Sequence, residues 1–226
     1  MPSNWSNALA AWASPCAVST SPPFPSTSWF RAVAAKPTIG VLALQGAFVE
    51  HEDYLRRSGA LPVEVRLPEQ LDEIDGLILP GGESTTIGKL LRRFGFEEPL
   101  RKFEKPIWGT CAGMILLSKE ILGGLPDQLA LDRIDLRVTR NAFGRQVDSF
   151  TAQLELSNLE EPIPAVFIRA PLAQPLSDRV EILAEVDGQV AAARQQNVWV
   201  SSFHPELSGD LRLHKAFVAS CRTGET

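Results

Sequence analysis

The chain has 226 residues, a formal net charge of −5 and a sequence pI near 5.3. Its hydrophobic content of 44% with 22% charged residues is that of a globular protein with a substantial core. The acidic balance argues against nucleic acid or an anionic membrane surface as the main partner, and no apolar run approaches the ~20 residues that span a bilayer.

The three cysteines, Cys16, Cys111 and Cys221, are far apart and odd in number, so they form no disulfide framework. We infer a reducing compartment. No cysteine–histidine cluster has metal-ligand spacing, and we expect no metal in this chain.

Residues 1–36 contain no Asp or Glu and are rich in Ser, Pro, Ala and Trp, so we expect a disordered leader. An acid-poor, Ser-rich leader resembles an organelle transit peptide, although this one is short of arginine. The alternative, which we favour, is an extension without a role. We predict one folded domain at 37–222 and a tail at 223–226. The expected location is the cytoplasm, or a plastid if the leader is a transit peptide.

Strands and helices alternate in the first half. The apolar run at 38–44 is typical of a strand buried on both faces of a parallel sheet. The further elements that we expect there are a helix at 48–58 closed by Gly59, strands at 63–67 and 75–79, a helix at 87–94, and a strand and helix around Cys111. This order implies right-handed crossovers and ligands at the carboxyl ends of the strands, where the loops after Leu44, Leu79 and Thr110 meet.

From residue 134 the pattern becomes alternating or β-branched, which predicts further strands, several of them antiparallel. We expect them at 134–139, 147–156, 165–169, 180–186, 189–193 and 197–203, followed by a helix at 210–221. The fold class predicted is α/β: a flavodoxin-like three-layer sandwich with a mixed, mostly parallel sheet and additional antiparallel strands in the second half.

Cys111 lies at the turn between a predicted strand and a predicted helix, with Gly109 and Gly113 two residues to either side. This spacing resembles a nucleophile elbow, in which small neighbours permit a strained turn. The helix N-terminus would favour a thiolate, and the N–H of Ala112 would be free to hold an oxyanion. The alternative is that Cys111 is one more buried small hydrophobic residue.

A base for Cys111 is best supplied by His204, which ends an apolar strand and is followed by Pro205. Proline favours extended geometry before it, so His204 and Glu206 are expected to point the same way, as imidazole and orienting carboxylate. His51, among acidic neighbours, is expected on a solvated helix face, and His214 in a structural or surface position. The alternative for His204 is an inert surface turn.

The loop at 79–84 contains Gly81 and Gly82, which would let backbone approach a ligand closely. A free N–H of Gly82, opposite that of Ala112, would complete an oxyanion hole. The alternative is a tight strand-to-helix turn with Ser84 as the N-cap, and both readings can hold together.

These motifs resemble the class I, triad-type glutamine amidotransferases, and more narrowly the glutaminase subunits of pyridoxal 5′-phosphate synthase. The residues that carry the narrower resemblance are LALQGAF at 42–48, LPGGESTT at 79–86, GTCAGM at 109–114, RNAFGRQVDSF at 140–150, FIRAP at 167–171 and SFHPEL at 202–207. They extend over nearly all of the chain outside the leader.

The resemblance implies hydrolysis of L-glutamine with Cys111 as nucleophile, His204 as general base and acid, and Glu206 as its orienting carboxylate. The substrate-binding residues that it implies are Gly82, Glu83, Ser84, Arg140, Ile168 and Arg169. Either arginine could clamp the substrate α-carboxylate, and the sequence leaves open which one does. A structural ion pair is the alternative for both.

The resemblance further implies no cofactor. It implies a partner, a (β/α)₈-barrel synthase subunit in a large hetero-oligomer that receives ammonia for vitamin B6 biosynthesis. The rival interpretations are a glutaminase of another pathway, such as histidine biosynthesis, a non-catalytic scaffold that kept the fold, and a cysteine peptidase.

Overall fold

The computed structural model describes residues 35–140 and 149–223, and all of these except Ala35 belong to one compact unit, Lys36–Thr226. The predicted leader and tail fall almost entirely outside the described residues and stay predictions, as do the boundaries of the folded domain. Residues 141–148 of the RNAFGRQVDSF motif are outside them as well.

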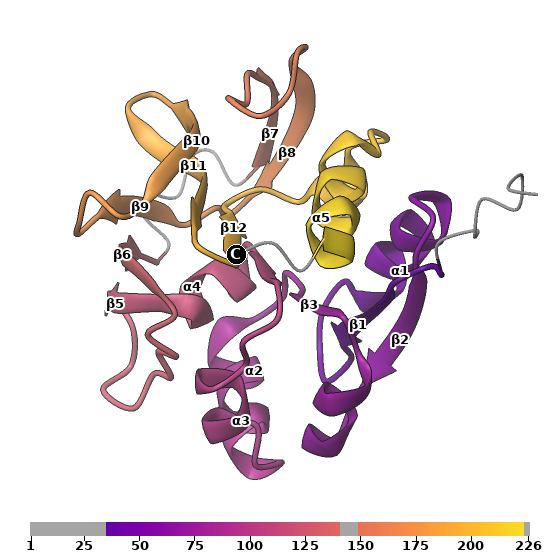
Figure 1. Ribbon diagram of the computed structural model, residues 1–226. Helices are drawn as coiled ribbons and strands as arrows, with labels where there is room; N and C mark the ends of the chain where they lie inside the picture. Colours follow the sequence, from indigo (N-terminus) through magenta and orange to yellow (C-terminus); the bar gives the residue numbers. More distant parts are fainter. Residues whose placement is uncertain (1–34, 141–148, 224–226) are drawn as a thin grey trace, which may run out of the picture. The chain divides into compact units, whose positions relative to one another are not determined.

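The main sheet has seven strands in the order β10-β11-β12-β4-β3-β1-β2 (Figure 1). Its parallel strands are β1 (Thr38–Leu42), β2 (Leu61–Val65), β3 (Gly76–Leu79), β4 (Ile107–Thr110) and β12 (Val198–Ser201). At one edge β10 (Glu181–Val186) and β11 (Gln189–Gln195) pair antiparallel. Because sequence-distant β4 and β12 are neighbours, the loops that follow them meet at one edge of the sheet.

Side chains alternate along the strands and feed two separate cores, one on each face of the sheet. On one face Ile78 belongs to the core of α1 (Phe48–Arg57) and α5 (Arg212–Thr223). On the other, Leu77 belongs to the core of α2 (Ser84–Arg93), α3 (Glu97–Arg101) and α4 (Ala112–Leu117). Because successive side chains of a strand point to opposite faces of the sheet, helices pack on both faces, which gives three layers of helix, sheet and helix.

The additional strands form two smaller sheets. A hairpin is made by β7 (Ser149–Leu154) and β8 (Ile163–Ile168). A three-stranded sheet contains β5 (Ser118–Leu122), β6 (Ile134–Thr139) and β9 (Leu172–Pro175), with β5 parallel and β9 antiparallel to β6. The α/β fold class, with its mostly parallel sheet and later antiparallel strands, is confirmed.

Several element predictions need correction. The second strand is two residues earlier than predicted, because it is an edge strand on which only Val65 is buried and the apolar pattern does not mark its start. The strands β5 and β9 were not predicted, since their short segments SKEIL and LAQP lack an alternating pattern. Among the described residues, no helix combines the length and apolar character needed to cross a membrane.

Candidate active site

Cys111 occupies the sharp turn between β4 and α4, with φ 47° and ψ −98°. The turn is possible because the two flanking glycines have no side chains and can therefore pack closely against backbone atoms. A Cβ on Gly113 would lie 2.1 Å from the carbonyl oxygen of Leu79, and one on Gly109 would lie 2.5 Å from the carbonyl carbon of Gly113. The spacing of the two glycines thus reflects direct backbone packing beneath the cysteine.

His204 and Glu206 meet Cys111 from the loop that follows β12. The Nδ1 atom of His204 lies 2.8 Å from Oε1 of Glu206. His204 is also close enough to Cys111 for the cysteine side chain to raise the pKa of the histidine, and Sγ of Cys111 lies 3.9 Å from the carbonyl oxygen of Ile168. The structure therefore brings the three predicted catalytic residues together. The predicted reason was wrong, however, because Pro205–Leu207 is a 3₁₀ helix (η2) and Glu206 is not in extended chain.

The electrostatics of this group favour a charged imidazole. Burial opposes the charge on His204, but the hydrogen bonds and charges of Cys111 and Glu206 outweigh burial and raise its pKa to about 10. Burial likewise opposes ionisation of Glu206, yet the nearby histidines His51 and His204 hold its pKa below the usual value. An imidazolium between a sulfur and a carboxylate is the arrangement that activates a thiol nucleophile.

A cavity of about 450 Å³ opens onto this group. Its lining residues are Gln45, Gly82, Glu83, Ser84, Cys111, Ile115, Arg140, Ile168, Arg169 and His204. All six predicted substrate-binding residues are in this set. Ile115, one turn along α4 from Cys111, was missed because an apolar helix residue looks like core in a sequence.

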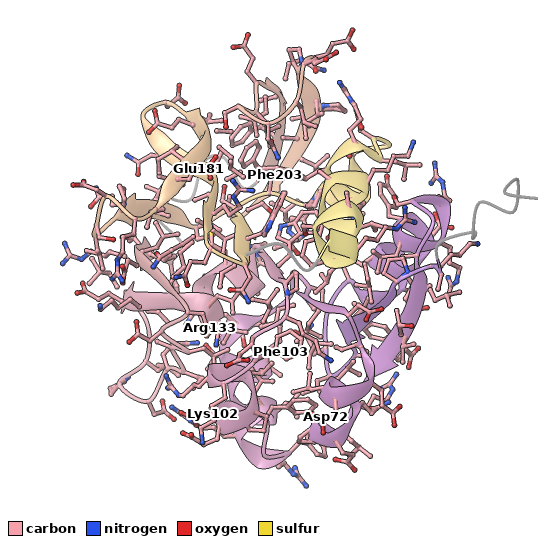
Figure 2. The ribbon with its side chains drawn as sticks, in the orientation of Figure 1. Asp72, Lys102, Phe103, Arg133, Glu181 and Phe203 are labelled. Atoms are coloured by element: carbon pink, nitrogen blue, oxygen red, sulfur yellow. The ribbon has the colours of Figure 1, made fainter. Side chains whose placement is uncertain are left out.

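Two larger cavities lie elsewhere in the described part of the chain. One, of about 550 Å³, is lined by Asp72, Lys102 and Phe103 among others, and the second, of about 770 Å³, by Arg133 and Glu181 among others (Figure 2). Neither lining includes a cysteine or a histidine. Size therefore does not single out the candidate site, whereas the presence of a cysteine together with a histidine does.

Glu83 is the N-cap of α2, which corrects the prediction that Ser84 holds that position. Its carboxylate accepts hydrogen bonds from the N–H groups of Thr85 and Thr86 at 3.1 and 2.6 Å. Partial burial opposes ionisation, but these bonds and those of the threonine hydroxyls lower the pKa of Glu83 to about 2. Glu83 thus presents a fixed negative charge at the cavity.

The two arginines of the cavity differ in their partners. Arg140 is held by Glu83, 3.1 Å from Oε1, and by Thr85 and Gln128, each at 2.9 Å. Arg169 is exposed, has φ 44°, and makes no ion pair or hydrogen bond with the described residues. Arg140 therefore fits the structural ion-pair alternative, while Arg169 is available to a ligand.

The predicted oxyanion-hole residues lie on the two loops that border the cavity. Among the described residues, nothing accepts a hydrogen bond from the N–H of Gly82 or of Ala112. The Gly82 loop is held from the first strand's loop, because Ala47 donates to the Gly81 carbonyl at 3.0 Å and Gln45 Oε1 accepts from the Glu83 N–H at 2.8 Å. The oxyanion role itself stays a prediction.

The expectation of a solvated His51 was wrong. His51 is fully buried, and its Nε2 atom lies 3.3 Å from Oε2 of Glu206. His214, also fully buried, lies 3.0 Å from the other ring nitrogen, in the structural position expected of it. The sequence did hold a signal, since His51 shares a helical face with Tyr54 and Leu55, both buried.

The described residues contain no group of three or more His, Cys, Asp or Glu side chains that could hold a metal ion.

Comparison with known proteins connects this geometry to a family. Residues 41–223 match the SNO glutamine amidotransferase family. "Pyridoxal 5'-phosphate synthase subunit PdxT" of Carboxydothermus hydrogenoformans is 54% identical over 184 residues, covering 80% of this chain and 95% of the relative. The protein of the same name from Herpetosiphon aurantiacus is 54% identical over 187 residues, covering 80% and 98%.

Solved structures agree. A crystal structure of a glutamine amidotransferase is 48% identical, with a TM-score of 0.77, and covers 81% of this chain and 98% of its own. A GMP synthase-type protein from Thermoplasma acidophilum, at 19% identity and a TM-score of 0.61 over 83% of this chain and 94% of its own, shares the fold. The chain belongs to the SNO glutamine amidotransferase family.

Proposed function

We propose that this chain is the glutaminase subunit of a pyridoxal 5′-phosphate synthase, hydrolysing L-glutamine to L-glutamate and ammonia. The observation that carries the proposal is the placement of Cys111 and the His204–Glu206 pair together at a cavity of about 450 Å³. The family match and the names of its relatives support the same activity.

The reaction follows from the charges in the cavity. The Cys111 thiolate attacks the side-chain carbonyl carbon of glutamine, and the resulting oxyanion is held by the N–H groups of Gly82 and Ala112. The His204 imidazolium gives its proton to the departing nitrogen, which leaves as ammonia. The same imidazole then takes a proton from water, whose oxygen attacks the γ-glutamyl thioester and releases glutamate and the thiolate.

Recognition of the amino-acid end falls to the charged residues that line the same cavity. Arg169 clamps the α-carboxylate, because it is the cavity's arginine without a partner among the described residues. Glu83 meets the α-ammonium, while Arg140 holds Glu83 in place. Gly82, Ser84 and Ile168 line the site through their backbone and shape.

The ammonia is delivered to a (β/α)₈-barrel synthase subunit in a large hetero-oligomer. The relatives' printed name, which marks each as one part of a synthase, supports a partner of this kind. The compartment that we propose is the cytoplasm, where the free thiols of Cys111 and Cys221 remain reduced.

The test is glutamate release from glutamine by the purified chain, with and without a cognate barrel subunit, beside Cys111→Ala. The proposal predicts release that depends on Cys111 and is greatest when the barrel subunit is present. Amide-¹⁵N glutamine should label the pyridoxal phosphate product even in excess unlabelled ammonium. Partner binding without any glutamine hydrolysis would favour the scaffold interpretation.

A further inference from the structure

A chain of buried polar groups extends from the triad carboxylate through His51 on α1 to His214 on α5. Oε2 of Glu206 is buried, and no hydrogen bond from another described residue reaches it, whereas Nε2 of His51 lies 3.3 Å away. The same ring nitrogen lies 3.2 Å from Oγ1 of Thr110, the residue before the nucleophile. Nδ1 of His51 lies 3.0 Å from Nε2 of His214 on α5.

Both ends of this chain select the same proton arrangement. A bare Nε2 on His51 would place its lone pair against the carboxylate of Glu206, so this nitrogen carries the proton, and its N–H is shared between Oγ1 of Thr110 at 3.2 Å and Oε2 of Glu206 at 3.3 Å. Nδ1 of His51 then accepts from Nε2–H of His214. Nδ1 of His214 is buried without a partner among the described residues, and an unprotonated nitrogen costs less there than an unpaired N–H.

The surroundings keep both histidines neutral. Burial lowers the pKa of His51 although the charge of Glu206 opposes this, with smaller effects of opposite sign from His204 and Glu50. Burial, assisted by His51, lowers the pKa of His214 well below its usual value. A neutral Nε2–H donor stabilises the carboxylate of Glu206 without adding a positive charge, so the carboxylate remains the counter-ion of His204.

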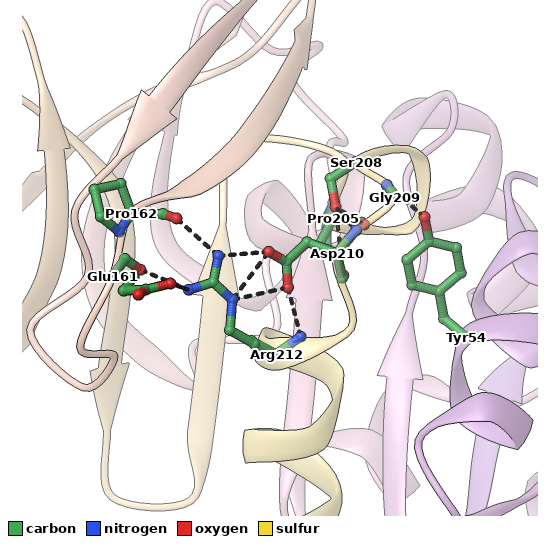
Figure 3. Close-up of polar contacts among 8 residues, drawn as sticks. All are labelled: Tyr54, Glu161, Pro162, Pro205, Ser208, Gly209, Asp210 and Arg212. Carbon is green, nitrogen blue, oxygen red and sulfur yellow. Dashed lines mark hydrogen bonds and ion pairs between the residues drawn. The ribbon is translucent and has the colours of Figure 1, made fainter.

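The helix α1 also holds the loop in which Glu206 lies. One turn after His51, the hydroxyl of Tyr54 accepts a hydrogen bond from the N–H of Gly209 at 2.7 Å (Figure 3). Beyond it, Asp210 pairs with Arg212, whose guanidinium donates to the carbonyl groups of Glu161 and Pro162 (Figure 3). The backbone of the loop and its carboxylate are thus fixed from the same face of α1.

We propose that His51 is a positioning residue for the triad: its Nε2–H donates to Oε2 of Glu206 and fixes the carboxylate against His204, while His214 fixes the tautomer of His51. The inference rests on the proposed glutaminase function. His51 does not line the cavity.

Two substitutions at position 51 separate this role from simple packing. In His51→Gln the side-chain amide can place an N–H near the Nε2 position, whereas in His51→Asn it reaches only the Nδ1 position. In the complex with the barrel subunit, His51→Asn should lower kcat roughly 10- to 100-fold with KM for glutamine unchanged. His51→Gln should recover most of that loss.

Phe217→Leu is the packing control, since Phe217 is buried in the same core beside Trp108, at 5.5 Å between ring centroids. It should lower the thermal midpoint without changing kcat. The inference is overturned if His51→Asn keeps the wild-type kcat, or if Gln and Asn variants lose kcat equally and in proportion to their thermal midpoints.

A second readout does not require activity. Imidazole ¹⁵N shifts of the full chain should show His51 and His214 as neutral Nε2–H tautomers at pH 7, with His204 charged. An Nδ1–H tautomer or a charged ring at His51 would reject the inference whatever the enzyme does. Absence of glutamine hydrolysis in the wild type, with the expected tautomers present, would instead count against the proposed function alone.

Discussion

At the scale of single residues, His204 is set between a sulfur and a carboxylate in a largely buried position. The pKa of His204, about 10, lies above the ordinary value of 6.5, so the histidine holds its proton more tightly in the folded protein than in the unfolded chain. The resulting stabilisation is fully present below pH 6.5 and is lost as the pH rises through about 10. We therefore expect glutaminase activity to persist well into alkaline solution.

Glu206→Gln tests this pairing. Loss of the carboxylate removes a contribution that raises the pKa of His204, so the alkaline limb of the kcat profile should move to lower pH. The free energy of unfolding should also fall less between pH 7 and 10 in the variant than in the wild type. Coincident alkaline limbs in the two proteins would show that Glu206 does not set the charge of His204.

The two arginines of the cavity give a second prediction. Arg169→Met should raise KM for glutamine roughly 10- to 100-fold with a smaller effect on kcat, because it removes a charge-assisted bond made to the substrate alone. Arg140→Met, unlike Arg169→Met, should lower the thermal midpoint of unfolding, since Arg140 bridges Glu83, Thr85 and Gln128. Steady-state kinetics and thermal unfolding on both variants would decide, and an unchanged KM in Arg169→Met would rule out its role.

At the scale of elements, the strand–turn–helix unit of β4 and α4 depends on close backbone packing. Gly113→Ala would place a methyl group 2.1 Å from the Leu79 carbonyl oxygen, and a backbone atom cannot move aside as a side chain can. We predict a loss of about 3 kcal/mol in the free energy of unfolding, together with loss of glutaminase activity.

Gly124→Ala is the matched control for this substitution. There the added Cβ meets only side-chain atoms of Gln128 and Ile121, the nearest at 3.2 Å. Chemical denaturation should show a change below about 1 kcal/mol. Equal stability of the Gly113 and Gly124 variants would mean that the turn at Cys111 tolerates a side chain at position 113 and that close backbone packing is not the reason for the glycine there.

Across the whole molecule, the sequence predicts the features that depend on residues close together in the chain. The sequence marks the parallel strands by apolar runs and by alternation, and it marks the turn at Cys111 by the flanking glycines. The pairing of β4 with β12, which brings His204 to Cys111, is a long-range contact that no single segment encodes.

The errors have the same origin. His51 was placed on a solvated face because its sequence neighbours are acidic, yet η2 and α5 cover it in the folded chain. Glu83, and not Ser84, caps the helix, because its carboxylate accepts hydrogen bonds from the N–H groups of Thr85 and Thr86 in the first turn. Each outcome depends on three-dimensional neighbours, which propensity and spacing do not supply.

Glutamine hydrolysis at this site requires that Cys111 form a γ-glutamyl thioester. The most direct measurement is peptide mapping by mass spectrometry after acid quenching of the chain and its barrel subunit during turnover of isotope-labelled glutamine. We expect a labelled glutamyl group on the peptide that contains Cys111, and none in Cys111→Ala. Glutamate release by a Cys111→Ala variant, or a glutamyl group on Cys221 in place of Cys111, would contradict it.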